Sequence, residues 1–99
     1  MNNERRKEIK NIKALLLFEN GLEEALDRLE QVLYEEENSY YSIPENLLGS
    51  KRAENSEDAI DYLSKAIEIL SSYIDNNERN QNHWKRISNN VRSELIKIR

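Results

Sequence analysis

Apolar residues recur at spacings of three and four along the first third of the chain. The series places its members on one face of an α-helix and predicts a helix over residues 3–37. Asn20 and Gly21 lie inside it, and this pair is typical of a helix end, so two shorter helices are the alternative. We favour one helix because the apolar series keeps its phase across Gly21. The series consists of Leu15, Phe18, Leu22, Ala25, Leu29 and Val32.

The next stretch is rich in residues that favour turns, and it holds the single proline of the chain. We therefore predict a connection over residues 38–55. Within it, a short helical turn over residues 44–48 would begin at Pro44 and end before Gly49.

Two further apolar series predict two more helices. The first covers residues 56–75, with Asn55 or Ser56 as its N-cap, and the second covers residues 78–98. The apolar positions are Ile60, Leu63, Ile67, Leu70 and Ile74 in the first series and Trp84, Ile87, Val91, Leu95 and Ile98 in the second.

These elements predict an all-α fold in a single helical domain over residues 1–99. The first two long helices would form an antiparallel, coiled-coil-like hairpin. The third, C-terminal helix either folds back on this hairpin or projects and pairs with another copy. Only 37% of the residues are hydrophobic, so the core is lean, and self-association into a homo-oligomer or docking on a target would add stability.

Charge is unevenly distributed along the chain. Residues 1–13 hold five bases and two acids, residues 14–78 hold four bases and sixteen acids, and residues 79–99 hold six bases and one acid. In an antiparallel hairpin this distribution predicts an acidic pole and a basic pole at opposite ends. The acids of the pole would either bind the basic third helix, serve as a docking face for a basic protein groove, or simply keep the protein soluble.

The candidate protein-interaction residues are the carboxylates of the long helices. They are Glu23, Glu24, Asp27, Glu30, Glu35, Glu36, Glu37, Asp58 and Asp61.

Three aromatic residues are candidates for partner contacts, since tyrosine and tryptophan are frequent among binding hot spots. They are Tyr40, Tyr41 and Trp84, and the alternative for each is packing in the core. Three bases near the tryptophan are candidate nucleic-acid contacts. These are Lys85, Arg86 and Arg92, although the acidic middle of the chain would repel phosphates.

Cysteine and histidine, two common catalytic residue types, are scarce. The chain has no cysteine and one histidine, and it contains no phosphate-binding or zinc-binding motif. The run Glu35-Glu36-Glu37 is consecutive, and consecutive helical residues do not share a face, so it does not indicate paired acid–base groups. We expect no enzyme activity, no metal and no cofactor. The longest apolar run, Ala14 to Phe18, is too short to span a membrane, and we expect a location in the bacterial cytoplasm.

Several short motifs resemble a group of small acidic proteins from phages and prophages of Firmicutes. The matching segments are the E-R-R-K start at Glu4–Lys7, the acidic run Glu35–Glu37, the turn Ile43-Pro44-Glu45-Asn46-Leu47, the segment Gly49-Ser50-Lys51-Arg52 and the helix from Ser56 to Leu63. The resemblance implies a helical hairpin and an origin in a mobile element, and phage proteins of this size often block a host defence protein. We therefore expect a non-enzymatic protein-binding protein, such as an anti-CRISPR-like inhibitor of a bacterial defence complex, that acts through an acidic helical face. A nucleic-acid-binding or regulatory protein and a structural oligomerisation module are the alternatives.

Overall fold

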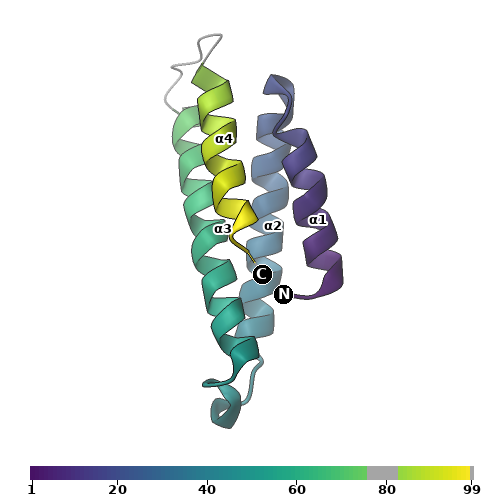
Figure 1. Cartoon of the computed structure of the whole chain (residues 1–99), viewed down its shortest axis with the longest axis vertical. Coiled ribbons are helices and arrows are strands. Elements are labelled where there is room, and N and C mark those ends of the chain that lie inside the picture. The colour runs from purple at the N-terminus through teal and green to yellow at the C-terminus, as the bar shows by residue number, and fades with distance from the viewer. Residues whose placement is uncertain (76–82, 99) are drawn as a thin grey trace.

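The fold is all-α, as predicted. The computed structural model describes residues 1–75 and 83–98, and these residues form four α-helices with no strand among them. The helices are α1 (Asn3–Leu15), α2 (Leu22–Tyr41), α3 (Lys51–Asp75) and α4 (His83–Ile96), and the 3₁₀ turns are η1 (Glu19–Gly21) and η2 (Glu45–Leu47). Successive helices alternate in direction along a bundle whose longest dimension is 50 Å (Figure 1).

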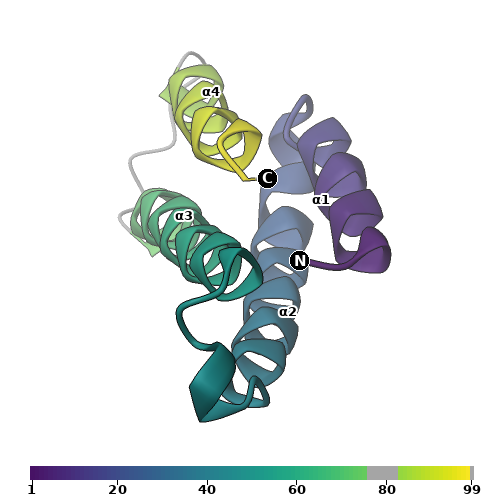
Figure 2. The ribbon, with the colours of Figure 1, turned by 60° about the horizontal axis from the view of Figure 1, so that its bottom comes forward.

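Each helix packs against the next one in the chain. α2 contacts α1 on one side and α3 on the other, and α3 contacts α2 and α4, whereas α1 and α4 touch each other at only a few residues. Figure 2 shows the result, a bundle in which α1 lies beside α2 and α4 beside α3. The C-terminal helix therefore folds back on the hairpin, which decides between the two predicted placements.

The prediction of a single helix over residues 3–37 was wrong. The chain leaves the helical path after Leu15, and α2 begins at Leu22. A Cβ atom on Gly21 would lie 2.4 Å from the carbonyl oxygen of Leu15, so the corner places the start of α2 directly against the end of α1, where only glycine fits. The apolar series also does not keep its phase, because Leu16 is fully buried whereas Phe18 is 61% exposed.

The connection between α2 and α3 is shorter than predicted. Residues 38–41 extend α2, and α3 begins at Lys51 rather than at residue 56. The cap of α3 is Ser50, whose Oγ accepts a hydrogen bond from the Ala53 amide at 3.3 Å. Ser56, predicted as the cap, is instead a buried residue within α3.

The two remaining boundaries agree more closely with the prediction. The helical turn predicted over residues 44–48 is the 3₁₀ turn η2. Of the helix predicted over residues 78–98, the part from His83 to Ile96 is α4, and residues 78–82 lie outside the described residues.

The core follows the axis of the bundle and receives side chains from all four helices. Alanines on the inner face of α3 allow the neighbouring helices to approach closely, and the Ser88 hydroxyl donates a hydrogen bond to the Leu16 carbonyl, which connects α4 to the end of α1. The core residues are Ile9, Ile12, Leu16, Leu22, Ala25, Leu29, Val32, Leu63, Ala66, Leu70, Tyr73, Val91 and Leu95.

Candidate protein-interaction surface

A regular stripe of acidic and aromatic residues covers the outer side of α2. Its members follow one another at alternating spacings of four and three, which keeps them on one face of the helix. Every member is exposed except Glu37, which is half-buried, and Tyr34 and Tyr41 are 63% and 74% exposed. The stripe consists of Glu23, Asp27, Glu30, Tyr34, Glu37 and Tyr41.

A second stripe of exposed carboxylates runs along α3. Its spacings of three, four, seven and seven also define one face of a helix. Tyr40 of α2 donates a hydrogen bond to Glu57 of this stripe, so the two stripes lie next to each other on the outside of the α2–α3 pair. The members are Glu54, Glu57, Asp61, Glu68 and Asp75. We call the carboxylates of both stripes the acidic face.

The nine predicted acidic residues divide into four groups. Glu24 and Glu35 lie on the flank of α2 nearer α1, where Arg28 reaches both Glu24 and Glu8 of α1. Asp58 lies on the flank of α3 nearer α4, beside Lys97, and Glu36 is buried. The residues that the structure places on the acidic face are Glu23, Asp27, Glu30, Glu37 and Asp61.

The basic residues are concentrated on the two other helices. α1 carries five bases and two acids, and α4 carries three bases and one acid. Since α1 and α4 occupy the opposite side of the bundle from the acidic face, charge is separated across the width of the molecule (Figure 2). The predicted separation between two ends was wrong, because the corner at residues 16–21 folds the basic start of the chain alongside α2.

The aromatic candidates lie at opposite ends of the bundle. Tyr40 and Tyr41 make an edge-to-face contact with ring centroids 5.7 Å apart at the end of α2. Trp84 is half-buried at the start of α4, where it lines a pocket together with Phe18, Tyr73 and Glu23. Tyr41 therefore belongs to the stripe on α2, and Trp84 shares a pocket with Glu23, the first member of that stripe, at the other end of the bundle.

The hydrogen bond from Tyr40 changes the chemistry of its phenol. The Glu57 carboxylate accepts a hydrogen bond from the Tyr40 hydroxyl, and this bond raises the pKa of Tyr40 above its ordinary value of 10.0. The partial dehydration of the phenol and the negative charge of Glu57 also raise this pKa. Tyr40 thus stays protonated and connects α2 to Glu57 of the second stripe.

The candidate nucleic-acid contacts do not form one cluster. Lys85 and Arg92 are seven residues apart, share one side of α4 and line a small pocket that faces the end of α1. Arg86 does not line this pocket, and its Nη2 atom lies 3.3 Å from the Nε2 atom of His83.

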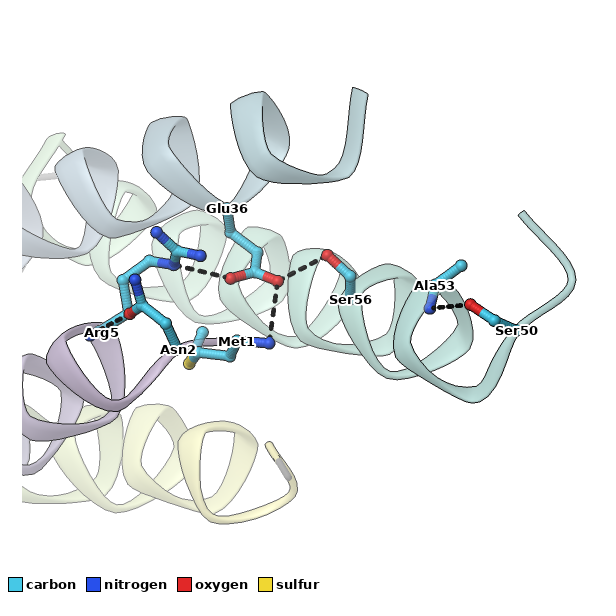
Figure 3. A network of polar contacts seen from close by, with 7 residues as sticks. All are labelled: Met1, Asn2, Arg5, Glu36, Ser50, Ala53 and Ser56. Carbon is cyan, nitrogen blue, oxygen red and sulfur yellow. Dashed lines mark hydrogen bonds and ion pairs between the residues drawn. The ribbon is translucent and has the colours of Figure 1, made fainter. Parts of the chain in front are cut away.

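Glu36 forms a buried polar network instead of part of a surface. Its residue is 1% exposed, and its carboxylate accepts from Arg5 Nε at 2.9 Å and from Ser56 Oγ at 2.6 Å, with the Met1 amino nitrogen 3.5 Å away (Figure 3). This network joins α1, α2 and α3. The sequence held a signal for it, because Glu36 follows Leu29 and Val32 at spacings of seven and four and so shares their buried face.

Several kinds of site are not found in the part of the chain that the structure describes. No group of three His, Cys, Asp or Glu side chains there could hold a metal ion. None of the helices α1 to α4 is long and apolar enough to cross a membrane. No protein-family model, curated protein or solved structure matches the chain.

Proposed function

We propose that this protein is a non-enzymatic binding protein that docks on a basic protein surface through its acidic face. The observation that carries the proposal is the gathering of nine carboxylates from α2 and α3 on one side of the bundle, with two exposed tyrosines among them. Lys65 is the base closest in helical position to these stripes, and its ammonium turns toward the Tyr62 ring, 5.8 Å from the centroid.

The composition of the surface suits this task. A field of one sign accelerates the encounter with an oppositely charged partner and sets its orientation. Exposed tyrosines supply the large and rigid contact area that is typical of binding hot spots, and Tyr34 and Tyr41 are available for this role. The carboxylates would then form the rim that selects the partner, and the tyrosines would anchor it.

The partner class that fits best is a protein with a basic groove for nucleic acid. The stripe on α2 extends from Glu23 to Tyr41, about 27 Å at 1.5 Å per residue, so it is long enough to occupy such a groove. Together with the resemblance to small phage proteins, this supports an inhibitor of a bacterial defence complex, anti-CRISPR-like in its mode of action, in the cytoplasm of the host cell.

Two variants with the same change in net charge test the proposal. Asp27→Lys with Glu30→Lys reverses two charges on the acidic face, and Glu24→Lys with Glu35→Lys reverses two charges on the other flank of the same helix. Each is used as bait in bacterial lysate, and the captured proteins are identified by mass spectrometry. We expect a nucleic-acid-binding protein that the wild type and the flank variant retain, and that the face variant binds about tenfold or more weakly.

A second measurement tests whether this protein occupies the nucleic-acid groove of the captured protein. Addition of the wild-type protein should displace labelled DNA or RNA from the partner, and the face variant should not. Equal binding by both variants, or a captured protein that keeps its nucleic acid, would contradict the proposal.

A second candidate function is nucleic-acid binding on the opposite side of the bundle. Lys85 and Arg92 on α4 favour it because they point toward the end of basic α1. Retention of labelled DNA or RNA by the purified protein, lost on charge reversal of Lys85 and Arg92 and kept on reversal of Arg86, would support it over the first.

A further inference from the structure

A pocket lined by arginines opens at the end of the bundle where α1 and α3 begin. It has a volume of about 480 Å³ and lies between the first turn of α1, the last turns of α2 and the first turns of α3. Its charged side chains are Arg5, Arg6, Arg52 and Glu36, and Asn2 and Asn55 add polar groups. We call it the arginine pocket.

The single carboxylate of this pocket does not neutralise all of its arginines. Glu36 is buried and already accepts from Arg5 Nε and Ser56 Oγ (Figure 3). Arg6 and Arg52 are exposed, and neither forms an ion pair or a hydrogen bond through its guanidinium within residues 1–75 and 83–98. The pocket therefore presents two guanidinium groups that no carboxylate of the described residues pairs with.

The helix ends add to this positive potential. α1 and α3 both begin at the pocket, and the amino ends of their dipoles are positive. The carboxyl end of α2 also lies there and is negative. All three ends are capped: Asn2 Oδ1 accepts from the Arg5 amide in α1, Ser50 Oγ accepts from the Ala53 amide in α3, and Ser42 bonds to the Asn38 carbonyl in α2. Two positive ends thus meet one negative end, beside three arginines.

We propose that the arginine pocket binds a phosphate dianion, either inorganic phosphate or the phosphate group of a monoester. Arg6 and Arg52 come from two different helices and supply the main contacts, since the guanidinium fork matches the spacing of phosphate oxygens. Arg5 donates to Glu36 through Nε and keeps its terminal N–H groups for a third contact. A dianion suits the site because it pairs with two cations that no carboxylate satisfies.

A titration followed by ¹H–¹⁵N NMR at constant ionic strength tests this proposal. One arm uses inorganic phosphate, a second uses phosphoserine, and sodium chloride serves as the reference. We expect saturable shifts at the first turns of α1 and α3 with phosphate, with phosphoserine or with both, and the comparison tells which source of phosphate the pocket takes. Shifts that do not saturate, or that chloride reproduces, would overturn the proposal.

Single substitutions distinguish a defined phosphate-binding site from a general effect of positive charge. Arg6→Ala and Arg52→Ala should each weaken binding about tenfold or more, because each removes charge-assisted hydrogen bonds. Lys85→Ala removes the same charge at the far end of the bundle and should bind like the wild type. Both arginines are exposed, so circular dichroism should show an unchanged fold. Equal weakening by all three substitutions would refute the pocket.

The arginine pocket does not depend on the acidic face. The variant with Asp27→Lys and Glu30→Lys should bind phosphate like the wild type, since its substitutions lie on the outer side of α2. Arg52→Lys keeps the charge but loses the fork, and it should bind with an affinity between those of the wild type and Arg52→Ala. If Arg52→Lys kept the full phosphate affinity of the wild type, the proposed contact through both arms of the Arg52 guanidinium would be contradicted.

Discussion

Removal of the Glu36 carboxylate should destabilise the bundle more than removal of any exposed acid. In Glu36→Ala, the Arg5 guanidinium and the Ser56 hydroxyl lose their partner, and the Arg5 side chain is only 13% exposed and cannot turn fully into water. Breaking one side of a buried ion pair costs about 3–5 kcal/mol, because the remaining charge is left without compensation.

This cost is large relative to the free energy of unfolding of the whole protein. A domain of 99 residues has a free energy of unfolding of roughly 5–15 kcal/mol. For a chain of this size, 1 kcal/mol corresponds to a change in Tm of about 4–8 °C. A loss of about 3 kcal/mol should therefore lower Tm by roughly 12–24 °C.

Glu35→Ala is the matched control, since it removes the neighbouring carboxylate from an exposed position of the same helix. It should change the free energy of unfolding by no more than about 0.5 kcal/mol. Urea unfolding followed by circular dichroism measures both variants. A difference of less than about 1 kcal/mol between them would refute the reasoning.

A double variant examines whether the network acts as a unit. Ser56 donates to the same carboxylate, so Glu36→Ala combined with Ser56→Ala should cost less than the sum of the two single changes. Strict additivity would show that Ser56 contributes through packing alone.

Three further predictions concern other parts of the bundle. Gly21→Ala places a methyl group against the last carbonyl of α1 and should cost about 1–3 kcal/mol in thermal melts, whereas Gly49→Ala, with open space around it, should change little. The pKa of Tyr40 is raised in the folded state, so the stability from its hydrogen bond to Glu57 is present below pH 10.0 and is lost as the pH rises through the folded-state pKa. Glu57→Gln should lower the pKa of Tyr40, which a spectrophotometric titration measures. Phe18 is exposed at the corner after α1, and we propose that it mediates the expected self-association, so Phe18→Ser should lower the mass measured by sedimentation.

Helical periodicity was sufficient for the parts of the fold in which local pattern and burial coincide. Leu22, Ala25, Leu29 and Val32 were placed on one face by spacing alone, and all four are buried. The long helices followed from the same spacing, and the antiparallel arrangement followed from the connection between them. These features could be predicted because each depends on residues within a few turns of one another.

The corner between α1 and α2 could not be predicted from apolar spacing, because it depends on contacts between residues that meet only in the folded chain. Gly21 is required by its approach to the Leu15 carbonyl, which exists only once the chain has folded back. The pattern around residues 14–18 is apolar at every position, so it offered two faces of equal quality, and Leu16 rather than Phe18 entered the core.

The acidic face was predicted in residue type but not in position, and its role in binding stays a prediction. Composition identified the carboxylates, yet it could not distinguish exposed Glu35 from buried Glu36, which differ only in helical phase relative to the core. Tyr34, Glu57 and Glu68 were missed for the same reason, since the face to which they belong is defined jointly by α2 and α3.

The separation of acidic and basic helices across the bundle also governs how copies of the protein meet. Two copies that approach through like faces repel each other, and two that approach through unlike faces attract. The attractive contact uses different patches on the two molecules, so it offers a fresh patch to a third copy and does not close into a dimer. We therefore predict that high protein concentration in dilute buffer promotes open-ended stacking and that added salt dissolves it, although the net charge of −4 alone would suggest mutual repulsion.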